Sequence, residues 1–264
     1  MKSNNLPIGI FDSGIGGTSI WKEIKALLPN ENTIYLSDSK NAPYGEKSVQ
    51  DIIDLSIKNT EFLLQRNCKL IVVACNTATT NAIKTLREKY TFPFIGIEPA
   101  IKPAALKTKT NVIGILATKG TLISELFEKT SSTISNQIAI KEKIGTGLVE
   151  LIESGEINSA EIKQLLNSYL KPMLKENVDC LVLGCTHYPY LLPQIREIVG
   201  DKMQIIDSGE AVARQTKAVL TKYKLLNIDL VNGTHQFYIN KIKDVLETLL
   251  PKENINLKID EKDF

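Results

Sequence analysis

The feature that most constrains the fold is the alternation of short apolar runs with longer amphipathic segments along the whole chain. Short β-branched runs are typical of buried parallel strands, and a 3.6-residue period is typical of helices. The pattern predicts an α/β chain in which helices cover both faces of parallel sheets. The expected strands are Ile8–Phe11, Thr33–Leu36, Leu70–Ala74, Phe94–Ile97, Asn111–Leu116, Ile138–Ile140, Cys180–Leu183 and Gln204–Ile206. The expected helices are Thr18–Leu28, Val49–Gln65, Thr79–Tyr90, Thr121–Lys129, Gly147–Ser154, Ser159–Lys175, Tyr190–Val199, Glu210–Tyr223 and Ile239–Leu250.

The strand pattern occurs twice, and in both copies a cysteine follows the third strand. Cys75 lies 63 positions after Asp12, and Cys185 lies 68 positions after Ala117. The segment Val-Val-Ala-Cys-Asn-Thr around the first cysteine is similar to Val-Leu-Gly-Cys-Thr-His around the second. Strand spacing of this kind could arise in any α/β chain, but it does not explain the paired cysteines.

We therefore predict two similar lobes, each a doubly wound parallel sheet, related by a pseudo-twofold axis. The first lobe is expected to contain residues 1–97 and 209–264, and the second residues 98–208. Ligands of such sheets bind beyond the carboxyl ends of the strands. If the lobes face each other, Cys75 and Cys185 approach one cleft from opposite sides.

The four cysteines fall into two pairs. Cys68 and Cys180 border apolar strands, where a cysteine is usually a small core residue. Cys75 and Cys185 lie where a strand ends and a helix begins, so backbone N–H groups supply positive potential. A free thiol has a pKa near 8.5 and needs such help to act as a thiolate. These two are candidates for chemistry.

Composition excludes several other classes of function. The chain carries 32 Lys and Arg against 30 Asp and Glu, and only 6% of its residues are aromatic, so we expect no nucleic-acid or membrane surface. No C-x-x-C pair is present and there are two histidines, so no metal site is expected. No phosphate-binding glycine loop points to pyridoxal phosphate, and we expect no cofactor. The absence of a signal peptide or a long apolar span leads us to expect a cytoplasmic protein with free thiols.

Polar residues at other strand ends have two interpretations each. The loop from Asp12 and Ser13 to Gly17 lacks the G-x-G-x-x-G spacing of a dinucleotide site. Asp12 could cap the next helix, meet a substrate ammonium or polarise a thiol, and Ser13 favours a cap. The segment Pro43-Tyr44-Gly45 is an ordinary turn when considered alone.

Residues of the second half are similarly open. Thr118 and Thr121 could be helix N-caps or could donate to a carboxylate. His187, two residues after Cys185, could hold that cysteine in a reactive state. Glu153 is by default an acid on a helix surface.

Taken together, the motifs resemble bacterial glutamate racemases. The resemblance rests on Ile8–Gly17, on Asp38 with Pro43-Tyr44-Gly45, on Ala74-Cys-Asn-Thr-Ala78, on Gly184-Cys-Thr-His-Tyr-Pro189 and on Asp207-Ser-Gly209. The histidine that follows Cys185-Thr186 favours glutamate over aspartate as the substrate.

The resemblance implies two lobes and deprotonation of glutamate at Cα by paired cysteines, without a cofactor. It implies that Cys75 removes the proton of D-glutamate and Cys185 that of L-glutamate, supplying D-glutamate for peptidoglycan. It assigns catalytic support to Asp12, His187 and Glu153. The substrate-binding positions that it implies are Asp12, Ser13, Pro43, Tyr44, Gly45, Asn76, Thr77, Thr118, Thr121, Thr186 and His187.

Alternatives remain at this point. The chain could racemise aspartate or another amino acid, bind an amino acid without turnover, or be a thiol redox protein. The sequence also leaves a homodimer open.

Overall fold

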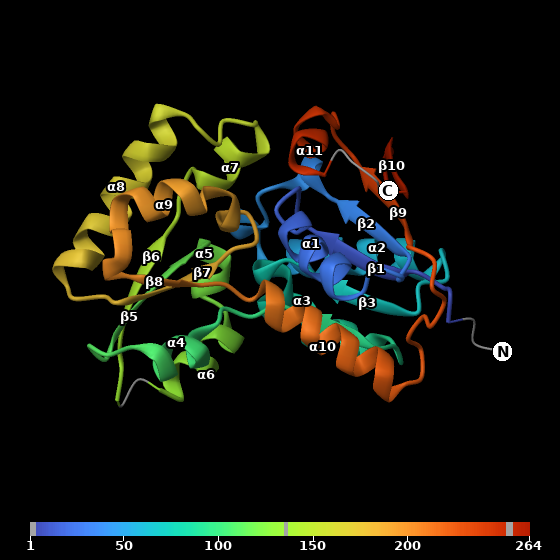
Figure 1. Ribbon diagram of the computed structural model, residues 1–264, viewed down its shortest axis with the longest axis horizontal. Helices are drawn as coiled ribbons and strands as arrows, with labels where there is room; N and C mark the ends of the chain where they lie inside the picture. The colour runs from blue at the N-terminus through green and yellow to red at the C-terminus, as the bar shows by residue number, and fades with distance from the viewer. Residues whose placement is uncertain (1–3, 135–136, 252–255) are drawn as a thin grey trace.

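The computed structural model describes residues 4–134, 137–251 and 256–264. Its strands form two separate parallel sheets, which lie side by side in Figure 1. The first sheet has the order β10-β9-β2-β1-β3-β4 and the second has the order β6-β5-β7-β8. The strands of the first sheet are β1 Ile8–Asp12, β2 Thr33–Ser37, β3 Leu70–Val73, β4 Phe94–Gly96, β9 Thr234–Ile239 and β10 Asn256–Glu261. Those of the second are β5 Val112–Ala117, β6 Ala139–Ile144, β7 Cys180–Gly184 and β8 Gln204–Ile206.

The predicted repeat is confirmed by the order of the strands. In each sheet the first strand of the repeat pairs with the second on one side and the third on the other, and the fourth lies beyond the third. The order β2-β1-β3-β4 is therefore the same as β6-β5-β7-β8. As expected, a cysteine follows the third strand of the repeat in both sheets.

Helices cover the sheets because their apolar faces must be buried. They are α1 Thr18–Leu27, α2 Val49–Leu64, α3 Asn76–Lys89, α4 Ile101–Lys107, α5 Lys119–Leu122, α6 Glu125–Ser132, α7 Leu148–Glu153, α8 Ala160–Lys175, α9 Leu192–Val199, α10 Gly209–Lys222 and α11 Asp244–Leu249. Helix α10 packs against α1, so the chain returns from the second sheet to the first (Figure 1). None of the helices within the described ranges has the length and apolar character needed to cross a membrane.

The C-terminal part of the chain differs from the prediction. A single helix over Ile239–Leu250 is wrong, because Ile239 ends strand β9 and helix α11 covers only Asp244–Leu249. In β9 the buried residues His235, Phe237 and Ile239 alternate with Gln236 and Tyr238, which is the period of a strand. Trp21 of α1 packs edge-on against both His235 and Phe237. The first sheet is thereby extended by two strands, β9 and β10, that the sequence analysis did not find.

Two smaller differences have local causes. The expected helix Thr121–Lys129 is divided into α5 and α6, because the Ser124 side chain accepts the Phe127 amide and starts a new helix. Helix α3 begins at Asn76 rather than Thr79, because the Cys75 sulfur accepts the Ala78 amide at its N-terminus. Helix α4 was not predicted.

Candidate active site

The first thiol lies at the junction of β3 and α3. Cys75 is buried, and its sulfur accepts the Ala78 N–H at 3.4 Å and donates to the Ser13 hydroxyl at 3.6 Å. Burial, and next the charge of nearby Asp12, raise the pKa of the Cys75 thiol well above its usual range. Cys75 is therefore a neutral thiol that can donate a proton.

The second thiol has a different partner. The Cys185 sulfur, just beyond β7, lies 3.7 Å from Nδ1 of His187. Nε2 of the same ring lies 2.7 Å from Oε1 of Glu153. Burial alone would lower the pKa of His187, but the hydrogen bonds to Cys185 and Glu153 hold it well above its usual value. An imidazolium therefore lies beside the second sulfur.

Glu153 is a buried residue, so the prediction of a helix-surface acid is wrong. Its Oε1 also accepts the Ile15 N–H at 2.7 Å. The glycines around Ile15 allow this approach: a Cβ on Gly14 would lie 1.9 Å from Oε1 of Glu153, and one on Gly16 would lie 2.2 Å from Nδ1 of His187. The loop after β1 has no room for side chains at these two positions.

Asp12 supports the same loop from behind. One oxygen of its carboxylate accepts the Gly14 and Gly17 amides at 3.2 and 2.8 Å, and the other accepts the Thr186 hydroxyl at 3.3 Å. Burial raises the pKa of Asp12 to about 6, although the His187 charge acts in the opposite direction. Both amides belong to the loop before α1, whose N-cap is Gly17 and has no side-chain cap, so Asp12 orders the loop and does not cap the helix. Asp12 does not line the cavity described next.

Both thiols line one small cavity between the two sheets. It contains about 250 Å³ of space between atoms, its mouth included. The residues around it are Ser13, Pro43, Tyr44, Gly45, Cys75, Asn76, Thr77, Thr118, Val149, Cys185, Thr186 and His187. Apart from half-buried Pro43 and Thr118, all of them are buried. The cavity is thus small and largely shielded from solvent.

Several polar groups in the cavity are available to a ligand. Both the Nδ2 and Oδ1 atoms of Asn76 are buried without a hydrogen-bond partner in the described part of the chain. Buried polar atoms normally have partners, so this side chain is suited to hold a polar ligand. The hydroxyls of Thr77 and Thr118 lie 2.7 Å apart, across the two lobes, and Thr121 lies behind them at 3.2 and 3.0 Å. Thr118 also caps α5 by accepting the Thr121 amide.

The fold agrees with comparisons to known proteins. The sequence model of the Asp/Glu/hydantoin racemase family matches residues 8–216, which is most of the chain. This chain belongs to that family.

Other members of the Asp/Glu/hydantoin racemase family show the same relationship. A glutamate racemase of Herpetosiphon aurantiacus is 43% identical over 248 residues, covering 91% of this chain and 98% of its own. A structure of Francisella tularensis glutamate racemase in complex with D-glutamate has a TM-score of 0.85 at 29% identity, covering 98% of both chains. A structure of Escherichia coli glutamate racemase in complex with L-glutamate and the activator UDP-MurNAc-Ala has a TM-score of 0.83 at 33% identity, covering 96% of this chain and 97% of the other.

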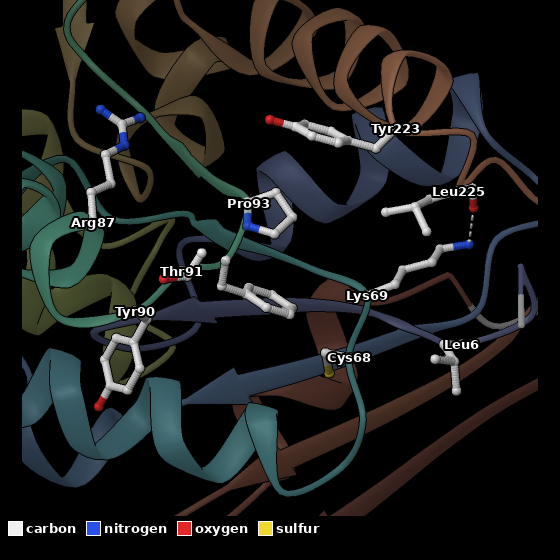
Figure 2. Close-up of a pocket in the computed structure, with 10 residues that line it drawn as sticks. Leu6, Cys68, Lys69, Arg87, Tyr90, Thr91, Pro93, Tyr223 and Leu225 are labelled. Carbon is white, nitrogen blue, oxygen red and sulfur yellow. Dashed lines mark hydrogen bonds between the residues drawn. The ribbon is translucent and has the colours of Figure 1, made fainter. Parts of the chain in front are cut away.

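A larger hollow of this family member lies elsewhere. It encloses about 1190 Å³, including solvent at its mouth, and its walls include Leu6, Cys68, Pro93 and Tyr223 (Figure 2). Burial raises the pKa of the Cys68 thiol to about 12, so it remains protonated. Lys69 in the same wall is already bound to Glu31 at 2.5 Å and to the Leu225 carbonyl at 2.9 Å. The larger hollow therefore contains a protonated thiol and a lysine that is already paired, and it is not the candidate active site.

Most residues of the cavity are among those expected from the sequence, and a few differ. Of the expected binding residues, Asp12 and Thr121 lie behind the wall, and the others line it. Val149 lines the cavity and was not predicted, because an apolar residue in an amphipathic helix carries no signal of its own. In the described part of the chain, no cluster of His, Cys, Asp and Glu could hold a metal ion.

Proposed function

We propose that this chain interconverts L- and D-glutamate without a cofactor, and that Cys75 and Cys185 are its two bases. The observation that carries the proposal is that two unlike thiols line one small cavity between the lobes. The relatives and solved structures described above are glutamate racemases, two of them with an enantiomer of glutamate bound, and these support glutamate as the substrate.

The chemistry requires a base and an acid on opposite faces of Cα. In the L-to-D direction, the Cys185 thiolate removes the Cα proton, and the electron pair is delocalised into the α-carboxylate. The Cys75 thiol then gives its proton to the other face of the same carbon. The product leaves with Cys185 protonated and Cys75 as a thiolate, and D-glutamate reacts through the reverse steps.

The surroundings of the two thiols support this assignment of directions. The pKa of Cys75 is raised, so this residue holds the proton that it must donate. The cation of His187 lies beside Cys185, the residue that must accept one.

A carboxylate that gains negative charge needs hydrogen-bond donors, because the Cα proton of an amino acid is a very weak acid. The unpartnered amide of Asn76 and the hydroxyls of Thr77 and Thr118 supply such donors. The walls of the cavity are almost entirely shielded from solvent, and this shielding strengthens the electrostatic effect of the donors.

The test is racemisation in deuterated water, followed by mass spectrometry of the separated enantiomers at low conversion. With L-glutamate as substrate, the first D-glutamate should carry deuterium at Cα, while the remaining L-glutamate stays protiated. A single base serving both faces could return the proton that it removed. Protium in most of the first-formed D-glutamate would therefore eliminate the two-thiol mechanism, and no D-glutamate at all would eliminate the function.

We further propose that this chain supplies D-glutamate for peptidoglycan, as the family resemblance implies. Expression of the chain should restore growth of a bacterial strain that requires added D-glutamate, and the Cys75→Ser variant should not. Growth that depends on D-glutamate in both cases would contradict this role.

A further inference from the structure

A buried carboxylate connects the Pro43–Gly45 turn to the C-terminal part of the chain. Asp38, directly after β2, is fully buried. Its Oδ2 accepts the Tyr44 hydroxyl at 2.5 Å, and its Oδ1 accepts the carboxamides of Asn41 at 2.8 Å and Asn240 at 2.5 Å. A buried carboxylate is tolerated only when donors surround it in this way.

The register of the sheet brings Asn240 to this place. Strands β2 and β9 are parallel, with Ser37 opposite Ile239. The next residues of the two strands, Asp38 and Asn240, are therefore neighbours at the carboxyl edge of the sheet. Both ends of the Asn240 carboxamide bind the same segment, because its Oδ1 also accepts the Lys40 N–H at 2.9 Å.

Tyr44 connects Asp38 to the cavity. Its hydroxyl donates to Asp38 and accepts from Asn59 at 3.1 Å, while the residue itself lines the cavity. The turn has little freedom on its other side, since a Cβ on Gly45 would lie 2.7 Å from Cβ of Thr118. Displacement of Asp38 would therefore move the turn relative to the second lobe.

We propose that Asn240 is a positioning residue for substrate binding, which holds the Pro43–Gly45 turn in place through Asp38 and Tyr44. Strand β9 lies outside the stretch that matches the family's sequence model, residues 8–216. The C-terminal part of this chain thus contributes to substrate affinity without lining the cavity. The inference rests on the proposed function, because the turn is a substrate-binding element only in that case.

The test compares two variants of Asn240 with a control on the same strand. Asn240→Asp keeps the size of the side chain but places a second carboxylate against Asp38, and Asn240→Ala removes both hydrogen bonds. Gln236→Ala is the matched control, because it removes a carboxamide of β9 that binds Asp260 at 3.0 Å in β10, the neighbour of β9 on the side away from β2 and Asp38. We expect KM for L-glutamate to rise roughly tenfold in both Asn240 variants, equivalent to about 1.4 kcal/mol of binding. The value of kcat should change by less than about threefold, a range that corresponds to well under 1 kcal/mol.

A second readout does not depend on activity. Hydrogen exchange of peptides that span residues 38–47 should be faster in both Asn240 variants than in the wild type and in Gln236→Ala. The double variant Asp38→Asn/Asn240→Asp restores one donor facing one acceptor and should recover part of the lost affinity.

The outcomes separate the two proposals. A wild-type protein that does not racemise glutamate would eliminate the proposed function, and the exchange data would still decide whether Asn240 orders the turn. Asn240 variants with the KM and exchange rates of Gln236→Ala would overturn the inference. Failure of both Asn240 variants to fold, checked by circular dichroism, would assign Asn240 a merely structural role and would also overturn it.

Discussion

Nε2 of His187 and Oε1 of Glu153 lie 2.7 Å apart in a buried pair, although 34 residues separate them along the chain. The same carboxylate oxygen accepts the amide of Ile15 from the other half of the molecule. Glu153 therefore fixes the imidazole beside Cys185 and also joins α7 to the loop after β1. One side chain thus connects the environment of a thiol to the contact between the lobes.

The thiols provide the first prediction. Cys75→Ser and Cys185→Ser should each lower racemisation by at least roughly a thousandfold in both directions, because every turnover uses one base and one acid. The rates are measured by chiral analysis from either enantiomer. The controls Cys68→Ser and Cys180→Ser alter buried thiols outside the cavity and should change stability more than turnover. Near-normal racemisation by Cys75→Ser would refute the mechanism.

The close packing of the glycine loop provides the second. Gly14→Ala and Gly16→Ala should lower kcat/KM at least roughly a hundredfold, the scale of a lost general acid–base contribution, because the new methyl groups displace Glu153 and His187. Gly200→Ala is the control: its φ is +55°, so alanine is strained there, but no atom lies within 4 Å. It should lose about 1 kcal/mol of stability and no activity. Full activity of Gly16→Ala would show that the His187 ring can move without consequence.

The raised pKa of Asp12 provides the third. Between its ordinary value of 3.8 and about 6, folded Asp12 retains a proton that the unfolded chain has lost. The folded state then binds more protons, so this residue makes stability fall as the pH rises through that window. Between pH 4 and pH 7 the wild type should lose about 2 kcal/mol of unfolding free energy relative to Asp12→Asn. Urea titrations at the two pH values measure this, and parallel pH curves of the two proteins would contradict it.

Two ion pairs of unlike burial provide the fourth. Lys69 and Glu31 are buried and lie 2.5 Å apart, whereas Lys89 and Glu61 are exposed and lie 3.4 Å apart. Glu31→Ala should cost about 3–5 kcal/mol, because the Lys69 charge stays buried without its partner. Glu61→Ala should cost less than about 1 kcal/mol. Denaturant unfolding at one pH compares them directly, and equal losses would show that burial does not govern these pairs.

The repeat and the two thiols could be predicted from the sequence, whereas strands β9 and β10 could not. Apolar runs beside Cys75 and Cys185 are local signals of the repeat, which the matching strand order of the two sheets confirms. Strands β9 and β10 were not predicted because polar and apolar residues are mixed in both, so helix and strand periods are hard to separate there. The burial of Glu153 could not be predicted either. It depends on Ile15 and His187, which are close to it only in the folded chain.

The enclosed cavity has a consequence for the rate of turnover. Its walls come from both lobes, and nearly all of its lining residues are buried, so glutamate can enter or leave only when the lobes separate. Such a movement displaces solvent, and solvent friction opposes it, whereas proton transfer between a sulfur and a carbon involves no large displacement. The dependence of kcat on solvent viscosity thus distinguishes the opening of the two lobes from the chemical step. If separation limits turnover, kcat falls as sucrose thickens the medium, and a slow Cys75→Ser variant, limited by chemistry, does not respond.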